Sequence, residues 1–236
     1  MKKYRLFCLP YAGGSSTVIY NKWRKYLLSS IDLIPIELSG RGRRINELFY
    51  SDIQEAVDDI YSMIVDSLDM PYSFYGHSMG TILAYEVTMK IINNGHRSPC
   101  HLFLSGRYPP HIRKEKNLSN ASDEEFKKEI LSLGGTSKEI LEDNGLMKMF
   151  LPIIRADYRI VESYRFKNDN KPFDFGITIF NGNDDEDVTE IDLEAWKEYT
   201  TKRFSCFKFK GGHFFINDEE NQKRIVNIIS NNIYRG

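Results

Sequence analysis

Cysteine is scarce in this sequence, and neither sign of charge dominates it. The three cysteines, Cys8, Cys100 and Cys206, are odd in number and widely spaced, which excludes a disulfide framework and gives no metal-ligand pattern. The net charge is −1, with 32 basic and 33 acidic residues, so the basic excess of a nucleic-acid-binding protein is missing. We therefore expect no metal, no cofactor and no nucleic-acid partner, with the cysteines packed in a reducing cytoplasm.

Long apolar runs are missing as well. No segment approaches the uncharged length of a membrane span, and Met1 to Arg5 leads into a strand-like run without the apolar core of a signal peptide. The hydrophobic fraction of 41% and the charged fraction of 28% are ordinary for a globular protein. We expect a cytoplasmic protein away from the membrane, with residues 1–236 forming one domain.

The most informative stretch is Gly76-His77-Ser78-Met79-Gly80, which has the pattern G-x-S-x-G. It follows a strand-like run, Tyr72 to Tyr75, and precedes a helical pattern that ends at Gly95. In this context the pattern predicts a sharp strand-to-helix turn that exposes the Ser78 hydroxyl. The flanking glycines are expected because side chains would collide where the strand and the helix cross.

The rest of the chain alternates between strand-like and helical patterns. We expect further strands at Tyr4 to Leu9, Leu33 to Leu38, His101 to Ser105, Gly176 to Asn181 and Phe204 to Phe209. Helices are expected around Ile19 to Leu28, after a capping box at Ser51 to Gln54, and from near Asn217. This alternation is typical of the α/β class, with a mostly parallel central sheet and helices on both faces.

One region, residues 109–170, breaks the alternation because it is helical and charged throughout. It has a capping-box start at Ser122 to Glu125 and a stop at Gly134-Gly135. We interpret it as a helical lid over the strand ends, with ordinary helical packing as the alternative. Some of its apolar residues should pack on the sheet and others should line a substrate channel; they are Leu118, Phe126, Ile130, Leu133, Leu146, Met149, Phe150 and Ile153.

A serine hydroxyl is a weak nucleophile at neutral pH and needs a neighbouring base. Among the five histidines, His213 lies directly after the last predicted strand, at the sheet edge where Ser78 is expected. The base needs an acid to orient it, and the loop after the strand at Gly176 to Asn181 carries four, residues 184–187. An acid in this loop gives the order serine, acid, histidine, which is that of α/β-hydrolases. Asp185 is our choice for the acid, and Asp184 is the runner-up.

The oxyanion of a tetrahedral intermediate also needs donors. The backbone N–H of Met79, at the start of a helix, is one candidate. The backbone N–H of Ala12, in the loop after the first strand, is the other, because Gly13 and Gly14 let this loop pass close to an acyl group.

Five motifs carry a family resemblance: Phe7 to Gly14, Gly40 to Gly42, Gly76 to Gly80, Leu151 to Tyr158 and Gly211 to Phe215. They resemble the type II thioesterases of nonribosomal peptide and polyketide synthesis, over nearly the whole chain. In that family the acid ends a G-x-x-D motif, which the chain has at Gly182 to Asp185. The resemblance implies a cytoplasmic α/β-hydrolase that removes stalled or wrong acyl groups from the phosphopantetheine arm of carrier proteins.

Two other functions remain open on the sequence. One is a small-molecule carboxylesterase or acyltransferase with the same triad, and the other is a catalytically silent binding protein on a hydrolase fold. If the protein is a type II thioesterase, we expect a monomer that meets its carrier transiently and in trans. Arg41, Arg43 and Arg44 are candidates for contact with the phosphate or acidic face of a carrier, and a solvated basic turn is the alternative.

Overall fold

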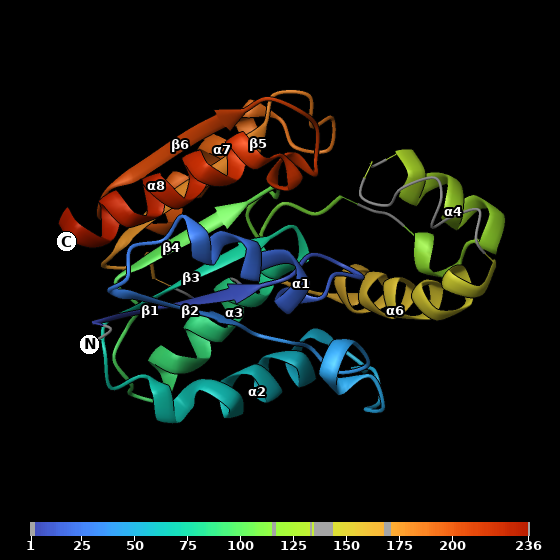
Figure 1. Cartoon of the computed structure of the whole chain (residues 1–236), viewed down its shortest axis with the longest axis horizontal. Coiled ribbons are helices and arrows are strands. Elements are labelled where there is room, and N and C mark those ends of the chain that lie inside the picture. The colour runs from blue at the N-terminus through green and yellow to red at the C-terminus, as the bar shows by residue number, and fades with distance from the viewer. Residues whose placement is uncertain (1–2, 115–116, 133, 135–143, 168–170, 236) are drawn as a thin grey trace.

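A parallel sheet forms the centre of the chain (Figure 1). The computed structural model describes residues 3–114, 117–132, 134, 144–167 and 171–235. In these residues the strands are β1 (Tyr4–Leu9), β2 (Ile31–Pro35), β3 (Tyr72–His77), β4 (His101–Ser105), β5 (Gly176–Gly182) and β6 (Phe204–Phe209). Their order is β2-β1-β3-β4-β5-β6, and every neighbouring pair is parallel. The predicted α/β class is therefore confirmed.

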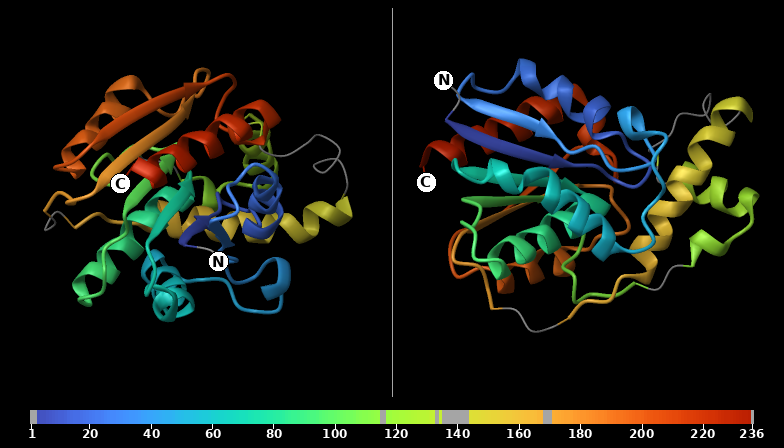
Figure 2. Two further views of the ribbon diagram at one scale, coloured as in Figure 1. Left: turned by 60° about the vertical axis from the view of Figure 1, so that its left-hand side comes forward. Right: turned by 90° about the horizontal axis from the view of Figure 1, so that it is seen from below.

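Helices cover both faces of this sheet (Figures 1 and 2). On one face lie α1 (Ser16–Tyr20) and α8 (Glu219–Arg235), which pack with Tyr75, Phe103 and Phe180. On the other lie α2 (Ile53–Ile64), α3 (Met79–Asn93) and α7 (Glu190–Glu194), which pack with Phe74, Leu104 and Ile179. The two sets of strand residues differ because successive side chains of a strand point to opposite faces.

The second strand begins and ends earlier than the sequence pattern suggests. It runs over Ile31–Pro35, although Leu33 to Leu38 was the prediction. The Ile36 N–H still donates to the Cys8 carbonyl, at 2.9 Å, but the chain then leaves the sheet. The reason lies in Glu37, whose buried carboxylate accepts hydrogen bonds from the Ser15 hydroxyl, at 2.8 Å, and from the Ser16 N–H, at 3.1 Å.

Three helix starts also differ from the predictions. The helix expected at Ile19 to Leu28 is the short α1, followed by a 3-10 turn over Asn21–Lys25. The N-cap of α2 is Asp52, not Ser51, because the Asp52 carboxylate accepts the Glu55 N–H at 2.8 Å. The last helix, α8, begins at Glu219 after a 3-10 turn over Phe215–Asn217. Each helix start differs from the prediction by only a few residues, since the local hydrogen bonds at the cap decide where a helix begins.

Between β4 and β5 the chain forms α4 (Asp123–Ser132) and α6 (Asn144–Ser163), beyond the carboxyl ends of the strands (Figure 1). We call residues 109–170 the helical insertion. The predicted capping box is confirmed, since the Glu125 N–H lies 3.3 Å from the Ser122 hydroxyl and the Ser122 N–H lies 3.1 Å from the Glu125 carboxylate. No strand occurs in its described part. Leu133, Gly135 and Asn170 lie outside the described residues.

None of the helices in the described ranges combines the length and the apolarity needed to cross a membrane.

Candidate functional site

The site lies where the strand order reverses. The chain leaves β1 for β2 on one side of the sheet, while β3 and the later strands extend on the other side. At such a point the loops after two neighbouring strands diverge and leave a crevice at the carboxyl edge of the sheet. The loop after β1 carries Ala12, and the turn after β3 carries Ser78.

Ser78 occupies the sharp turn that the sequence predicts. Its φ of 55° makes it the one non-glycine residue with a positive φ in the described chain. A Cβ on Gly76 would lie 2.1 Å from the Gly80 carbonyl oxygen, so only glycine fits there. The Ser78 N–H donates to the Ser105 carbonyl of β4, at 2.8 Å, which fixes the turn to the sheet. Backbone strain of this kind persists where the surroundings hold it, and it is typical of functional sites.

The structure brings the predicted serine, histidine and acid together. His213 Nε2 lies 3.0 Å from Ser78 Oγ, and His213 Nδ1 lies 2.8 Å from Asp185 Oδ2. The Asp185 side chain is 1% exposed, and its second oxygen accepts the Asp187 N–H at 3.1 Å. Asp184, the runner-up, is exposed. The order of hydrogen bonds from acid to imidazole to hydroxyl is the one that activates a serine.

Close backbone packing positions the acid loop against the histidine loop. A Cβ on Gly182 would lie 2.3 Å from the carbonyl oxygens of Gly211 and Gly212. The Asn183 N–H donates to the Phe209 carbonyl at 2.8 Å, and the Asp184 N–H donates to the Gly211 carbonyl at 3.0 Å. The two loops therefore hold their register through the backbone, which leaves the Asp185 side chain free to face His213.

His77 is part of the turn but not of the hydrogen-bond chain. It is buried, its Nδ1 is hydrogen-bonded to Ser105 Oγ at 2.8 Å, and its ring centroid lies 5.1 Å from that of His213. Burial, together with the neighbouring imidazole of His213, holds the pKa of His77 well below its ordinary value. His77 is therefore a neutral packing residue, hydrogen-bonded to Ser105 and not to Ser78.

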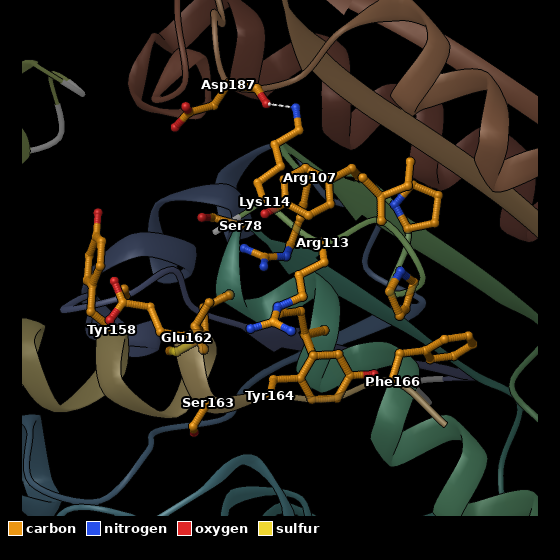
Figure 3. A pocket seen from close by; sticks show the side chains of 18 of the residues that line it. Ser78, Arg107, Arg113, Lys114, Tyr158, Glu162, Ser163, Tyr164, Phe166 and Asp187 are labelled. Carbon is orange, nitrogen blue, oxygen red and sulfur yellow. Dashed lines mark hydrogen bonds between the residues drawn. The ribbon is translucent and has the colours of Figure 1, made fainter. Parts of the chain in front are cut away.

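A cavity of about 730 Å³ opens over the serine (Figure 3). It is lined by Ser78 and by Ala12 and Met79, the two residues whose backbone N–H groups are the predicted oxyanion donors. Much of the remaining lining comes from residues 106–114 and from the carboxyl half of α6. No group of three or more metal-ligating side chains occurs in the described ranges.

The prediction that apolar residues of the helical insertion line a substrate channel is wrong for the residues that the structure describes. Among the described residues, none of the predicted apolar set of the helical insertion lines this cavity, which Tyr108, Tyr158, Val161 and Phe166 line instead. The insertion forms a small core of its own, in which Phe126 and Ile130 pack against α6. Met149, by contrast, is 62% exposed. A helical pattern identifies an apolar stripe but does not say which neighbour covers it.

Sequence reasoning missed Asp157 of α6, which joins three segments. Its carboxylate accepts the Gly13 N–H at 2.6 Å and the Arg41 guanidinium in a bidentate pair, at 2.5 and 2.7 Å. Both charged side chains are 3% exposed. We call this contact of Asp157 with Gly13 and Arg41 the oxyanion-loop clamp. The sequence did contain a signal, because Arg41 lies in the motif Gly40 to Gly42 and Asp157 lies in the motif Leu151 to Tyr158. Neither residue has a catalytic role that would explain its place in a motif.

Two of the three arginines that were candidates for carrier contact, or for a solvated turn, are instead paired within the chain. Arg41 is buried and paired with Asp157, while Arg44 is half-buried and paired with Glu47 and Asp59. Of the three arginines, Arg43 alone is exposed in the described structure.

We expect Asp157→Asn to lower the turnover number by about 10²-fold, the cost of one misplaced oxyanion donor. The change leaves Arg41 buried without its carboxylate and weakens the bond that holds the loop carrying Ala12. Steady-state kinetics with thermal unfolding measure the effect. Asp59→Asn is the matched control, because it breaks the Arg44 pair without touching Gly13. Equal losses of turnover in the two variants would reduce the clamp to a stabilising contact.

The fold and the site together define a class. A parallel sheet with a strained serine turn after β3, and with the acid and the histidine following β5 and β6, is the arrangement of the α/β-hydrolases. Within that class, the chain belongs to the thioesterase domain family, whose model matches residues 4–233.

Individual relatives agree with this assignment. The chain is 39% identical over 215 residues to the gramicidin S biosynthesis protein GrsT of Aneurinibacillus migulanus, covering 91% of this chain and 83% of that protein. It is 32% identical to the medium-chain S-acyl fatty acid synthase thioesterase of Homo sapiens, covering 96% and 86%. The crystal structure of ClbQ, from the colibactin NRPS/PKS pathway, superposes with a TM-score of 0.93 at 35% identity, covering 99% and 98%. The predicted family and fold are confirmed.

Proposed function

We propose that this protein is a type II thioesterase, which hydrolyses aberrant or stalled acyl groups from the phosphopantetheine arm of carrier proteins in nonribosomal peptide or polyketide synthesis. The observation that carries the proposal is the hydrogen-bond chain from Asp185 through His213 to Ser78, in a member of the thioesterase family. The pathway comes from relatives such as GrsT and ClbQ, whose similarity spans nearly the whole chain.

In the proposed mechanism the Ser78 hydroxyl attacks the thioester carbonyl while His213 Nε2 takes its proton. The N–H groups of Met79 and Ala12 stabilise the oxyanion of the tetrahedral intermediate. The C–S bond then breaks, the pantetheine thiol leaves with the proton from His213, and the acyl group stays on Ser78. Water, deprotonated by His213, then attacks this ester. The bond to Ser78 Oγ breaks, His213 returns the proton to Ser78, and the free acid leaves. Asp185 holds the imidazole in its tautomer throughout. No step uses a cofactor.

The helical insertion serves in this proposal as a lid. Residues 109–114 and the carboxyl half of α6, which belong to the insertion, line the cavity together with Ser78. A wall of this kind limits which acyl groups reach the serine and excludes bulk water from the intermediate. The carrier is a separate protein that delivers its arm and leaves, so binding is transient.

The test compares one acyl group on three leaving groups: a carrier protein, N-acetylcysteamine and ethanol. We expect the carrier thioester to have the highest kcat/KM, exceeding that of the ethyl ester by at least about tenfold, which is about 1.4 kcal/mol of transition-state binding. The N-acetylcysteamine thioester separates thioester chemistry from carrier recognition. Faster hydrolysis of the ester would favour a small-molecule esterase. No turnover, together with no labelling of Ser78 by a phosphonate, would favour a binding protein.

A further inference from the structure

Arg107 enters the cavity beside the proposed base. It follows Gly106, at the end of β4, where a Cβ would lie 2.6 Å from His77 Cε1 and 3.4 Å from His213 Cε1. The backbone therefore passes directly against the imidazole of His213. Figure 3 shows the Arg107 side chain directed into the cavity, on the side where Ser78 lies. A charge at this position is within reach of the acyl group of a bound thioester.

The guanidinium of Arg107 has no hydrogen-bonded or ion-paired carboxylate among the described residues. Within the described chain it makes no side-chain hydrogen bond or ion pair, and its Cζ lies 4.8 Å from the centre of the Tyr108 ring. The Arg107 side chain is half-buried, and the loss of hydration lowers the pKa of its guanidinium. A buried cation is costly unless an anion compensates it, so an unpaired arginine in a cavity indicates a site for an anionic ligand.

Two carboxylates line the cavity, and neither forms a hydrogen bond or an ion pair with Arg107 in the described chain. The Asp187 carboxylate acts on Arg107 through its charge alone. The Glu162 carboxylate, which also lines it, already accepts the N–H groups of Leu118, at 2.7 Å, and Ser119, at 3.1 Å. Lys114, a second cation of the lining, is paired with Asp192 at 2.7 Å. Arg113 and Arg159 line the same cavity and add positive charge to it. The electrostatic field therefore favours a ligand that brings its own negative charge.

We propose that Arg107 binds a carboxylate carried by the acyl group, so that the substrates include acyl chains with an acid function a few bonds from the thioester carbonyl. A guanidinium binds a carboxylate through two parallel N–H···O bonds, which also fixes the orientation of the chain. The phosphate of the carrier arm is a poorer candidate, because the whole pantetheine chain separates it from the reacting carbonyl. This inference rests on the proposed thioesterase function, which places the acyl group at Ser78.

The experiment uses two phosphate-free substrates of equal shape, glutaryl-pantetheine and its neutral 4-carbamoylbutyryl analogue. For the wild-type protein we expect kcat/KM to be about tenfold or more higher for the glutaryl thioester, as a charge-assisted hydrogen bond provides. In Arg107→Met the ratio of the two values should fall to about one. A ratio cancels general losses of activity, while phosphonate labelling of Ser78 and thermal unfolding report on the fold.

Arg159→Met is the matched control, because Arg159 lines the same cavity but is exposed, so water screens its charge. It should keep the wild-type ratio. A wild-type ratio of one, or the same fall in both variants, would overturn the inference.

A third comparison, valeryl-pantetheine against valeryl-4′-phosphopantetheine, tests whether Arg107 binds the phosphate of the carrier arm instead. An Arg107-dependent gain from the phosphate, without one from the carboxylate, would also overturn it. If neither thioester is hydrolysed, the proposed function itself fails, whereas hydrolysis without preference removes only the carboxylate site.

Discussion

Ser78→Ala is expected to lower thioester hydrolysis by about 10⁶-fold, to the level that binding and the oxyanion donors alone provide. The Ser78 hydroxyl lies 3.0 Å from His213 Nε2 and at the wall of the cavity, so no other group takes its place in the first step. Alanine removes one oxygen atom and leaves the strand, the helix and the flanking glycines unchanged. Single-turnover hydrolysis of an acyl-carrier substrate measures the loss, and mass spectrometry should find no acyl-enzyme.

Ser163→Ala provides the control for this variant. Ser163 also borders the cavity, but its hydroxyl donates to the Ile160 carbonyl of its own helix, at 3.1 Å, and Figure 3 shows it pointing away from Ser78. We expect this variant to retain acyl-enzyme formation. If Ser78→Ala kept most of the wild-type rate while remaining folded, the nucleophile would have to be sought elsewhere.

The sequence predicts those parts of the fold and the site that depend on local chemistry. The turn at Ser78 is readable because two glycines, a strand pattern and a helix pattern occur within one short stretch. The placement of Asp185 and His213 follows from a general rule, since the carboxyl ends of parallel strands share one edge of the sheet. These predictions need no knowledge of how distant side chains meet.

The features that the sequence does not reveal depend on distant contacts. Arg41 and Asp157 are 116 residues apart, and nothing in either motif says that a buried ion pair joins them. The early end of β2 has the same origin, because Glu37 leaves the sheet to bind the backbone at the start of α1. The lining of the cavity was mispredicted because the α6 residues that face it are mainly polar or aromatic. Local patterns fix elements, whereas tertiary contacts decide their ends and their faces.

Asp185→Asn should lower turnover by about 10⁴-fold, whereas Asp184→Asn should change it little. The Asp185 carboxylate accepts a hydrogen bond from His213 Nδ1 at 2.8 Å and is 1% exposed, so the charge acts on the imidazole without screening by water. An asparagine amide at this position favours the tautomer in which Nδ1 lacks its proton, and Nε2 then no longer accepts the proton of Ser78. Asp184 is exposed and contacts the Gly211 carbonyl through its backbone N–H, which the substitution retains.

The pair Asp185→Asn and Asp184→Asn therefore separates two adjacent acids that differ in exposure and not in charge. Both variants should unfold at similar temperatures, because neither side chain belongs to the apolar core of the sheet. Turnover numbers on one acyl-carrier substrate, measured beside each unfolding temperature, give the ranking. The reverse ranking would transfer the orienting role to Asp184 and would require the loop after β5 to shift by one residue in the working enzyme. Two equal and large losses would mean instead that the acidic loop supports His213 as a whole, through the backbone bonds that join it to Gly211.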